Sequence, residues 1–225
     1  MARVVKEYDE RYAEFLDVAQ RLFYTKGYAQ TPVQEIIDAI GVAKGTFYHY
    51  FDSKGDLLDA LIERMLTQQL QSLTPLMQDT TTDAATKFSR FFDHFGSWKV
   101  ANKAFFIDLM HVMYHDDNVL LRTKMVTMSA QRIVPVLAAI IEQGVEEGVF
   151  AVDYPAEAAE VSLQIGTALG ETFVRLLLTQ ERGPERTETA RRKVHAYERS
   201  LERVLGAAEG SVHVIEPTQI REWLE

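Results

Sequence analysis

The residues that could do chemistry are concentrated in one stretch, residues 31–58, with the sequence TPVQEIIDAIGVAKGTFYHYFDSKGDLL. Lys44 and Thr46 can hydrogen-bond the edges of bases or phosphate oxygens, and Gly45 between them would let a helix backbone approach DNA closely. Lys54 opens a further helical pattern, where its amide and ammonium groups can hold a phosphate. This pattern predicts a nucleic-acid interface; the alternative is a small helical hairpin with exposed tyrosines.

The elements that would position these residues are two short helices and the start of a third. Ile36, Ile37 and Ile40 give the first helix an apolar stripe. Thr31 before Pro32 predicts an N-cap followed by proline at the first helical position.

A tight turn and a second helix follow. Gly41 is predicted to end the first helix in a left-handed conformation. The second helix covers residues 44–51 and would turn Phe47 and Phe51 toward a core. Ser53 is expected to cap the third helix. This layout is a helix-turn-helix, whose second helix enters the major groove of DNA.

The segment GVAKGTFYHYFDSKGDLL, residues 41–58, resembles the signature of TetR-family transcriptional regulators, and the similarity extends from about Phe15 to about Leu61. The resemblance implies an all-helical, dimeric, ligand-responsive protein. It also implies that Tyr48, His49 and Tyr50 contact phosphates and the groove. The predicted DNA-binding residues are Thr31, Lys44, Gly45, Thr46, Tyr48, His49, Tyr50 and Lys54.

Composition fits an ordinary globular protein of one or two domains, with 225 residues, 47% hydrophobic and 25% charged. The absence of cysteine excludes disulfides and thiolate chemistry. The N-terminus has no apolar signal core and no uncharged run reaches the ~18 residues of a membrane span. These features predict a cytoplasmic protein with no membrane partner.

The net charge of −9 argues against binding DNA through a large basic patch. Residues 1–55 contain seven basic and eight acidic side chains, so the acidity lies mainly in the rest of the chain. Weak non-specific attraction to phosphate is expected, with affinity that depends on two heads binding together.

The chain is predicted to be all-α, with helices from the apolar periodicity over residues 8–26, 54–73, 83–98, 102–114, 117–147, 155–180 and 185–205. Pro75 and the polar stretch after it are expected to end the connecting helix. The predicted domains are a helix-turn-helix head at 1–55 with the connecting helix to about 73, a ligand-binding and dimerisation domain at 74–208, and a tail at 209–225.

Aromatic and methionine side chains are frequent on the helices between residues 83 and 180, where they could line an apolar cavity. Ordinary core packing is the alternative for any single residue, and the resemblance favours a pocket for the group. Glu171 and Arg175 are expected to form a packed ion pair, with an interface contact or a polar anchor for a ligand as the alternatives. The predicted ligand-binding residues are Phe91, Phe95, Phe105, Phe106, Met110, Met113, Met125, Met128, Glu171 and Phe173.

The helix over residues 155–180 is apolar on most sides and carries Gly166 and Gly170 four residues apart. A helix of this kind must be buried on most faces, and small residues permit close helix packing. We therefore expect the last two long helices to pair with a second copy. The predicted interface residues are Gly166, Gly170, Val174, Leu177 and Leu201.

His111 and His115 share a helix face with Asp108, but two histidines at this spacing are a weak metal signal, so neither a metal nor another cofactor is predicted. The chain has no GxSxG, HExxH, phosphate-loop or dinucleotide motif, and no catalytic residue is predicted. The leading hypothesis is a repressor that binds a palindromic operator as a homodimer and is released by a small apolar or amphipathic inducer. An all-helical carrier or adaptor without DNA binding is the alternative.

Overall fold

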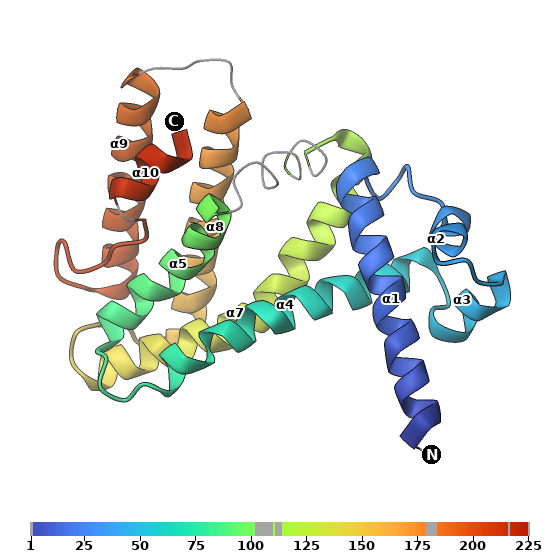
Figure 1. Ribbon diagram of the computed structural model, residues 1–225. Helices are drawn as coiled ribbons and strands as arrows, with labels where there is room; N and C mark the ends of the chain where they lie inside the picture. Colours follow the sequence, from blue (N-terminus) through green and yellow to red (C-terminus); the bar gives the residue numbers. More distant parts are fainter. Residues whose placement is uncertain (1, 102–109, 111–113, 179–183, 216, 225) are drawn as a thin grey trace. The chain divides into compact units, whose positions relative to one another are not determined.

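The computed structural model describes residues 2–101, 110, 114–178, 184–215 and 217–224, and every regular element among them is helical (Figure 1). The expected all-α fold is confirmed. The elements are α1 (Ala2–Lys26), α2 (Val33–Ile40), α3 (Lys44–Tyr50), α4 (Lys54–Gln78), α5 (Ala84–Ala101), the 3₁₀ turn η1 (Asp116–Asn118), α7 (Val119–Glu146), α8 (Pro155–Leu178), α9 (Pro184–Leu205) and α10 (Pro217–Leu224).

The chain forms two compact units. The first consists of Met1–Gln68 together with Asp108–Met128, and the second of Gln69–Ile107 together with Ser129–Glu225. The helices α4 and α7 each begin in the first unit and continue into the second. The unit that contains the helix-turn-helix therefore also contains the first turns of α7, which lie within the range predicted for the second domain, residues 74–208.

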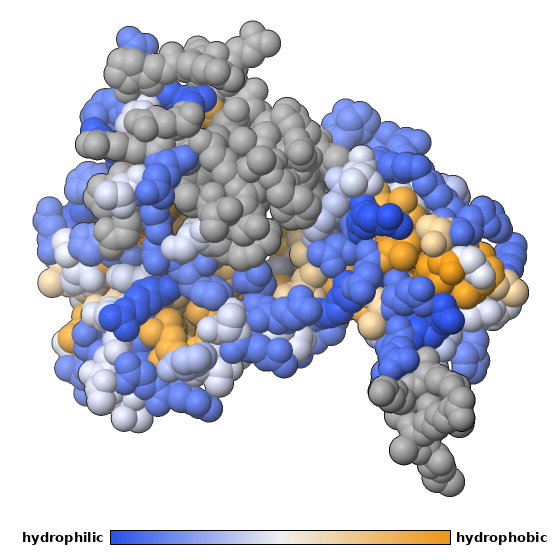
Figure 2. All heavy atoms as spheres, in the orientation of Figure 1, coloured by the Kyte–Doolittle hydropathy of each residue, from blue (hydrophilic) through white to orange (hydrophobic). Residues whose placement is uncertain are grey.

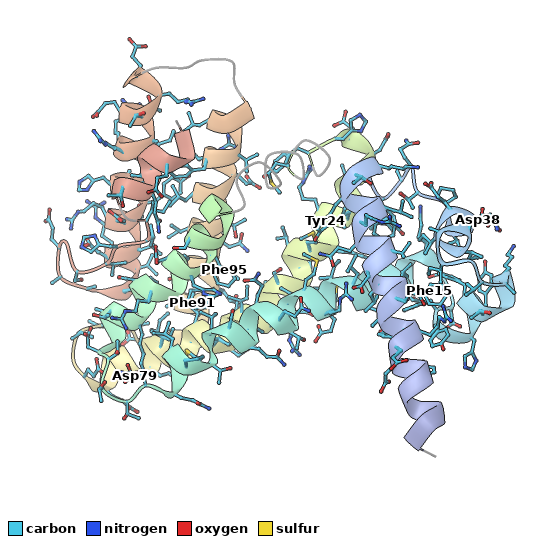
Figure 3. The ribbon with its side chains drawn as sticks, in the orientation of Figure 1. Phe15, Tyr24, Asp38, Asp79, Phe91 and Phe95 are labelled. Atoms are coloured by element: carbon cyan, nitrogen blue, oxygen red, sulfur yellow. The ribbon has the colours of Figure 1, made fainter. Side chains whose placement is uncertain are left out.

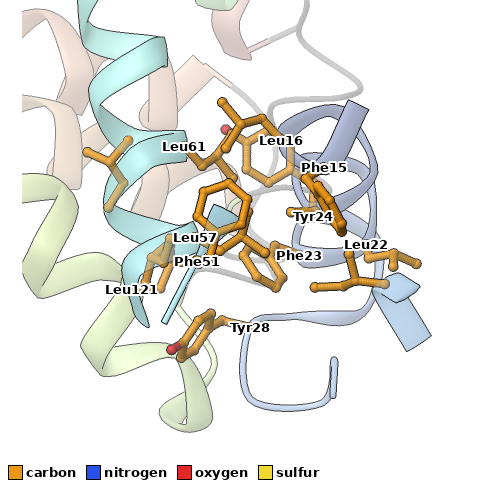
Figure 4. Packing of buried hydrophobic residues seen from close by; sticks show 14 of the residues in the cluster. Phe15, Leu16, Leu22, Phe23, Tyr24, Tyr28, Phe51, Leu57, Leu61 and Leu121 are labelled. Atoms are coloured by element: carbon orange, nitrogen blue, oxygen red, sulfur yellow. The ribbon is translucent and has the colours of Figure 1, made fainter. Parts of the chain in front are cut away.

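The core of the first unit forms where α1, α3 and α4 meet (Figure 4). Phe15 and Phe23 of α1, Phe47 of α3 and Leu57 of α4 are fully buried, and Leu121 of α7 joins the same cluster. Each such side chain contributes roughly 1.5–3 kcal/mol relative to an exposed one. The helix-turn-helix thus packs against one continuous hydrophobic core.

Two of the three predicted helix ends in the head are confirmed. Gly41 has φ 76° and ends α2 in the left-handed region. Ser53 Oγ accepts a hydrogen bond from the amide of Asp56 at 3.1 Å, as a cap of α4 should. The predicted cap at Thr31 is wrong, because Pro32 occupies the N-cap position and Thr31 Oγ1 donates to the carbonyl of Gly27 instead.

The connecting helix α4 is longer than its sequence suggests. Pro75 lies inside the helix, which continues to Gln78. The predicted end near Leu73 is therefore wrong. Proline here gives up the one backbone hydrogen bond that its missing N–H would donate to the carbonyl of residue 71, and the helix continues beyond it.

In the second unit, α8 packs along α9, and α10 packs against α9, α5 and α8. The core contains Phe88 and Phe91 of α5 and Leu137 and Ile141 of α7. Gly166 of α8 approaches α5 so closely that a Cβ there would lie 2.4 Å from the ring of Phe92. Packing within one chain therefore explains why glycine is needed at this position.

The C-terminal segment, residues 210–214, is hydrogen-bonded to other elements of the second unit. Glu202 is buried, and its carboxylate accepts a hydrogen bond from the amide of Gly210 at 2.6 Å. The same carboxylate forms an ion pair with Arg199. Glu198 Oε1 accepts from the amide of Val214 at 3.1 Å. The amide of His213 donates to Ser89 Oγ on α5 at 3.1 Å. These bonds join the segment to both α9 and α5.

One helical stretch in the described part of the chain, Asp116–Glu146, is long and apolar enough to cross a membrane by length and composition, with a mean hydropathy of 1.4. Core helices of soluble proteins pass the same test. Leu121, Leu137 and Ile141 of this stretch are buried within the protein.

Candidate nucleic-acid interface

The recognition helix α3 exposes a short set of donors above its buried side. Phe47 is fully buried, whereas Lys44, Gly45, Tyr48 and His49 are exposed. Tyr48 is 49% exposed, and the ammonium of Lys44 lies 5.9 Å from its ring centre, within cation–π range. A cation and an aromatic hydroxyl are thereby presented together on one face, next to a glycine that leaves the backbone open.

The aromatic side chains behind α3 fix its position. Tyr50 is half-buried, and its ring centre lies 4.6 Å from that of Tyr8 and 5.5 Å from that of Phe15. Tyr8 also meets His49 edge to face, with 6.0 Å between the ring centres. The far end of α3 is therefore held against α1, and Tyr50 serves this contact rather than projecting outward.

The turn between α2 and α3 is part of the same surface. Gly41 and Ala43 are exposed and Ile40 and Val42 are half-buried. Figure 2 shows hydrophobic surface over this part of the head, next to hydrophilic side chains. Because the turn carries no acidic side chain between Asp38 and Lys44, a phosphate backbone could approach it without charge repulsion.

Lys54 is the first residue of α4, as predicted, but its side chain makes contacts within the head. Its ammonium donates to the carbonyl oxygens of Tyr28 at 2.9 Å and Thr31 at 3.1 Å, and it lies 4.3 Å from the centre of the Tyr28 ring. Burial lowers the pKa of this lysine below its ordinary value. Its side chain ties the start of α4 to the loop before α2, so its first role is within the head.

Thr31 also lies inside the head. Its side chain is 0% exposed and donates to the carbonyl of Gly27 at 2.8 Å. Direct contact between this hydroxyl and DNA is therefore inconsistent with the structure. Thr46 is half-buried, which leaves Lys44, Gly45, Tyr48 and His49 as the predicted residues with the freest access to DNA.

Sequence reasoning missed Asn118, which supports the loop between α1 and α2. Asn118 Oδ1 accepts hydrogen bonds from the amides of Tyr28 at 2.9 Å and Ala29 at 3.4 Å. An asparagine before an apolar helical pattern is a signal for a helix start. Nothing in the sequence indicates a partner 90 residues away.

The residues predicted to bind a ligand fall into both units. Met110, Met125 and Met128 pack against the core of the first unit, so their first role is to support the head. Phe91 and Phe95 lie one turn apart on α5 of the second unit, with ring centres 5.3 Å apart (Figure 3). Phe105, Phe106 and Met113 lie outside the described residues, as do Asp108 and His111.

Phe173 and Glu171 lie on opposite sides of α8. Phe173 is buried in the second unit. Glu171 lies 3.8 Å from Arg175, so these two residues form the expected i,i+4 ion pair, although both side chains are exposed rather than packed. Among the described residues, no group of three or more potential metal ligands lies close enough together to hold an ion.

The second unit contains an open groove of about 760 Å³ that is lined by residues of α7 and α8 and by Tyr197 of α9. Its lining is mostly apolar, with Val134, Pro135 and Val161 among its residues. Val161 is 46% exposed and lies next to the other apolar residues that line the groove.

The predicted dimer residues are used differently. Val174 and Leu201 are buried within the chain, and Gly166 contacts Phe92. Packing within one chain therefore accounts for these three; Val174 and Leu201 are buried by it, and Gly166 is half-buried. Gly170 is half-buried, and the side chain of Leu177 lies outside the described residues.

Two family models match the chain, and together they cover more than half of it. Residues 15–61 match the model for bacterial regulatory proteins of the tetR family. Residues 103–174 match the model for the tetracyclin repressor-like C-terminal domain. The first match contains α2 and α3, and the second contains most of α7 and α8.

Individual proteins are similar over shorter spans. The HTH-type transcriptional repressor KstR2 of Rhodococcus jostii is 41% identical over 56 residues, which is 25% of this chain and 28% of that protein. The HTH-type transcriptional regulator EthR of Mycolicibacterium smegmatis is 31% identical over 100 residues, 43% of this chain and 46% of that protein. The chain therefore aligns with less than half the length of these curated relatives.

A solved structure of a TetR transcription regulator from Haloarcula marismortui has a TM-score of 0.59 and 23% identity, covering 85% of this chain and 98% of that one. At this identity the likeness demonstrates the fold.

Proposed function

The chain belongs to the TetR family of bacterial regulatory proteins, and from this premise we propose that it is a ligand-responsive transcriptional repressor that binds a palindromic operator as a homodimer. The observation that supports DNA binding best is the exposed set on α3, where Lys44, Tyr48 and His49 project from a helix fixed by buried Phe47. Two such helices in a symmetric dimer would read half-sites ~34 Å apart.

The arrangement of exposed and buried side chains on α3 supports a DNA-binding regulator over a carrier. A carrier without DNA binding would have no use for a cation and an aromatic side chain held together beside an exposed glycine. Lys44 and Tyr48 are placed to meet phosphate and groove, while Gly45 permits close approach of the helix.

We propose that the second copy docks on the exposed faces of α8 and α9, including the groove between α7 and α8. The exposed aliphatic Val161 and the apolar lining of the groove support this assignment. The acidic Glu157 and Glu160 of α8 and the basic Arg191 and Arg192 of α9 are also exposed, so an antiparallel pairing of two copies could join opposite charges.

The effector in this proposal is a small apolar or amphipathic molecule that binds among the aromatic side chains of the second unit. Its binding would favour a dimer state whose heads no longer match the half-site spacing. The family is one of regulators, and we propose no catalytic activity and a cytoplasmic location. A thermal shift with a panel of apolar compounds tests the effector, since a ligand of the folded state raises Tm.

The decisive experiment for DNA binding is selection of genomic fragments by the full-length protein, followed by titration of a retained fragment at several salt concentrations. Tyr48→Ala should weaken binding about tenfold, because a central contact is lost. Tyr154→Ala is the matched control, since this tyrosine is 70% exposed and belongs to the second unit. Failure of the wild-type protein to retain any fragment, or equal effects of the two variants, would contradict the proposal.

A further inference from the structure

The loop between α1 and α2, residues 27–31, is closed by one side chain from a distant part of the chain. Asn118 is 4% exposed, and its Oδ1 accepts the amides of both Tyr28 and Ala29. Gly27 in this loop has φ 90°, and a Cβ there would lie 2.8 Å from Asn118 Nδ2. The asparagine therefore fits the loop with no space for a side chain at Gly27.

This loop in turn fixes both helices that frame the recognition helix. The carbonyl oxygens of Tyr28 and Thr31 accept hydrogen bonds from the ammonium of Lys54, which is the first residue of α4. Thr31 is followed by Pro32, the N-cap residue of α2. Any change in the loop would consequently reach the start of the helix-turn-helix and the start of α4 at the same time.

On its other side, Asn118 is attached to α7. It directly precedes Val119, the first residue of α7. One turn on, Leu121 is buried in the core of the head, and Lys124 Nζ donates to both carboxylate oxygens of Asp59 on α4 at 2.6 and 2.8 Å. The first turns of α7 are thus fixed to the head, and the same helix continues to Glu146 in the second unit.

An asparagine that served only to begin α7 would direct its oxygen to amides in the first turn of that helix. Asn118 Oδ1 instead accepts amides that lie about 90 residues earlier. Losing this acceptor would leave Tyr28 N–H, which is buried, without the carbonyl that now satisfies it, and buried donors without a partner are costly.

We propose that Asn118 is a positioning residue, through which α7 sets the conformation of the 27–31 loop and hence the placement of α2 and of the start of α4, the two helices that frame the DNA-binding helix α3. The proposal rests on the proposed DNA-binding function. Asn118 keeps the head in the conformation that binds DNA. The apparent affinity for DNA is therefore expected to fall as the fraction of molecules with a released 27–31 loop rises.

Full-length variants test this role. Asn118→Leu removes the acceptor at similar volume, and Asn118→Asp keeps an acceptor at the same place. Gln30→Ala is the matched control, because it removes an exposed hydrogen bond of 3.1 Å to Asp117 at the same junction. Each protein is compared by amide hydrogen exchange at residues 28 and 29 and by affinity for a genomic fragment retained by the wild type.

Asn118→Leu should speed exchange at both amides at least tenfold and weaken DNA binding about tenfold. It should leave exchange unchanged at the amide of Phe51, the C-cap residue of α3, which bonds the Phe47 carbonyl. Asn118→Asp should restore both properties to within about threefold of wild type, and Gln30→Ala should change neither. Should Asn118→Leu fail to fold, Asn118→Ala replaces it, with the same expectation.

Wild-type exchange and affinity in the leucine and alanine variants would overturn the proposal, as would an aspartate variant no better than leucine. The proposal would also be overturned if Gln30→Ala weakened DNA binding as much as Asn118→Leu does. In that case any change near the 27–31 loop would weaken binding, and the effect would not be specific to Asn118. If the wild-type protein retains no genomic fragment, the proposed function fails, while the exchange comparison still decides whether Asn118 fixes the loop.

Discussion

Lys54 and Lys44 are ten residues apart in the same motif, yet they are placed for different tasks. The ammonium of Lys54 is held by two backbone carbonyls and by the Tyr28 ring, inside the head. Lys44 is exposed beside Tyr48. Both lysines look equally available in the sequence, and only the fold separates a structural cation from one that can reach phosphate.

We therefore predict opposite effects for two alanine variants. Lys54→Ala should lower the free energy of unfolding by roughly 1–3 kcal/mol, because two carbonyls lose a charged donor. Lys44→Ala should leave stability unchanged and lower the salt slope of DNA binding by ~1. Chemical denaturation and salt titration measure the two quantities. A stable Lys54→Ala protein with an altered salt slope would return Lys54 to the DNA interface.

Glu198 is a second residue whose environment decides its chemistry. Burial raises the pKa of its carboxyl above the ordinary value of 4.5 and outweighs the hydrogen bond from Val214 and the attraction of His213 and His195. The folded protein thus binds this proton more tightly than the unfolded chain does. The stability that comes from this group is full below pH 4.5 and is lost as the pH rises through the folded pKa.

Glu198→Gln should accordingly raise Tm at pH 7, because glutamine keeps an acceptor for the Val214 amide and removes the buried charge. The gain should shrink as the pH falls below about 4.5, where the wild-type carboxyl is protonated in both states. Glu188→Gln, an exposed site on the same helix, is the control and should show no gain. Thermal melts across pH measure the effect, and an equal gain at pH 4 and pH 7 would contradict this explanation.

At the scale of the element, the helix-turn-helix contains two glycines with different roles, Gly41 in the turn after α2 and Gly45 within α3. Gly41 has φ 76°, whereas Gly45 has ordinary helical geometry, and a Cβ on either would meet no neighbour within 4 Å. Steric space is therefore equal at the two sites and only the backbone conformation differs. Gly41 is required by the turn, and Gly45 is not required by the fold.

Alanine at these two positions should shift stability in opposite directions. Gly41→Ala should destabilise the head by roughly 1–2 kcal/mol, the cost of a left-handed residue with a Cβ. Gly45→Ala should stabilise it by up to ~1 kcal/mol, because alanine is the better helix former. If α3 lies against DNA as proposed, Gly45→Ala should nevertheless weaken operator binding. Denaturation curves and DNA titrations test this, and unchanged binding would place Gly45 outside the interface.

At the scale of the whole molecule, the question is how two copies meet. The apolar residues that seemed suited to pairing, such as Val174 and Leu201, are buried in one chain, and Gly166 accommodates the ring of Phe92. What remains available on α8 is its outer face, with Val161 at the groove. A homodimer built on this face would cover apolar surface that one chain leaves exposed.

Val161→Glu should convert a dimer to monomer at micromolar concentration and leave the Tm of the protomer nearly unchanged, since the side chain is already largely solvated. A buried unpaired carboxylate costs several kcal/mol at an interface. Val145→Glu is the matched control, a valine of the second unit that is 38% exposed and does not line the groove. Sedimentation velocity distinguishes the variants, and a dimeric Val161→Glu protein would exclude this face.

Much of the fold was predictable because its determinants are local. Apolar spacing predicted the helices of the head, Gly41 its turn and Ser53 its cap, since each depends on residues within a few positions of one another. The family signature in residues 41–58 is local for the same reason, and the matches to the family models confirm it. Local rules failed at Thr31, where a hydroxyl that could cap α2 bonds Gly27 instead.

Contacts between distant segments were decided by the tertiary structure alone. The sequence by itself determined an all-helical chain of the TetR family with a helix-turn-helix near its N-terminus. It could not determine that Asn118 hydrogen-bonds the 27–31 loop, that the Lys54 side chain faces inward, or that the Phe92 ring leaves no space for a side chain at Gly166. Helix periodicity specifies which face of a helix is buried, but many partners can bury it, and the partner is chosen by the packing of the whole core.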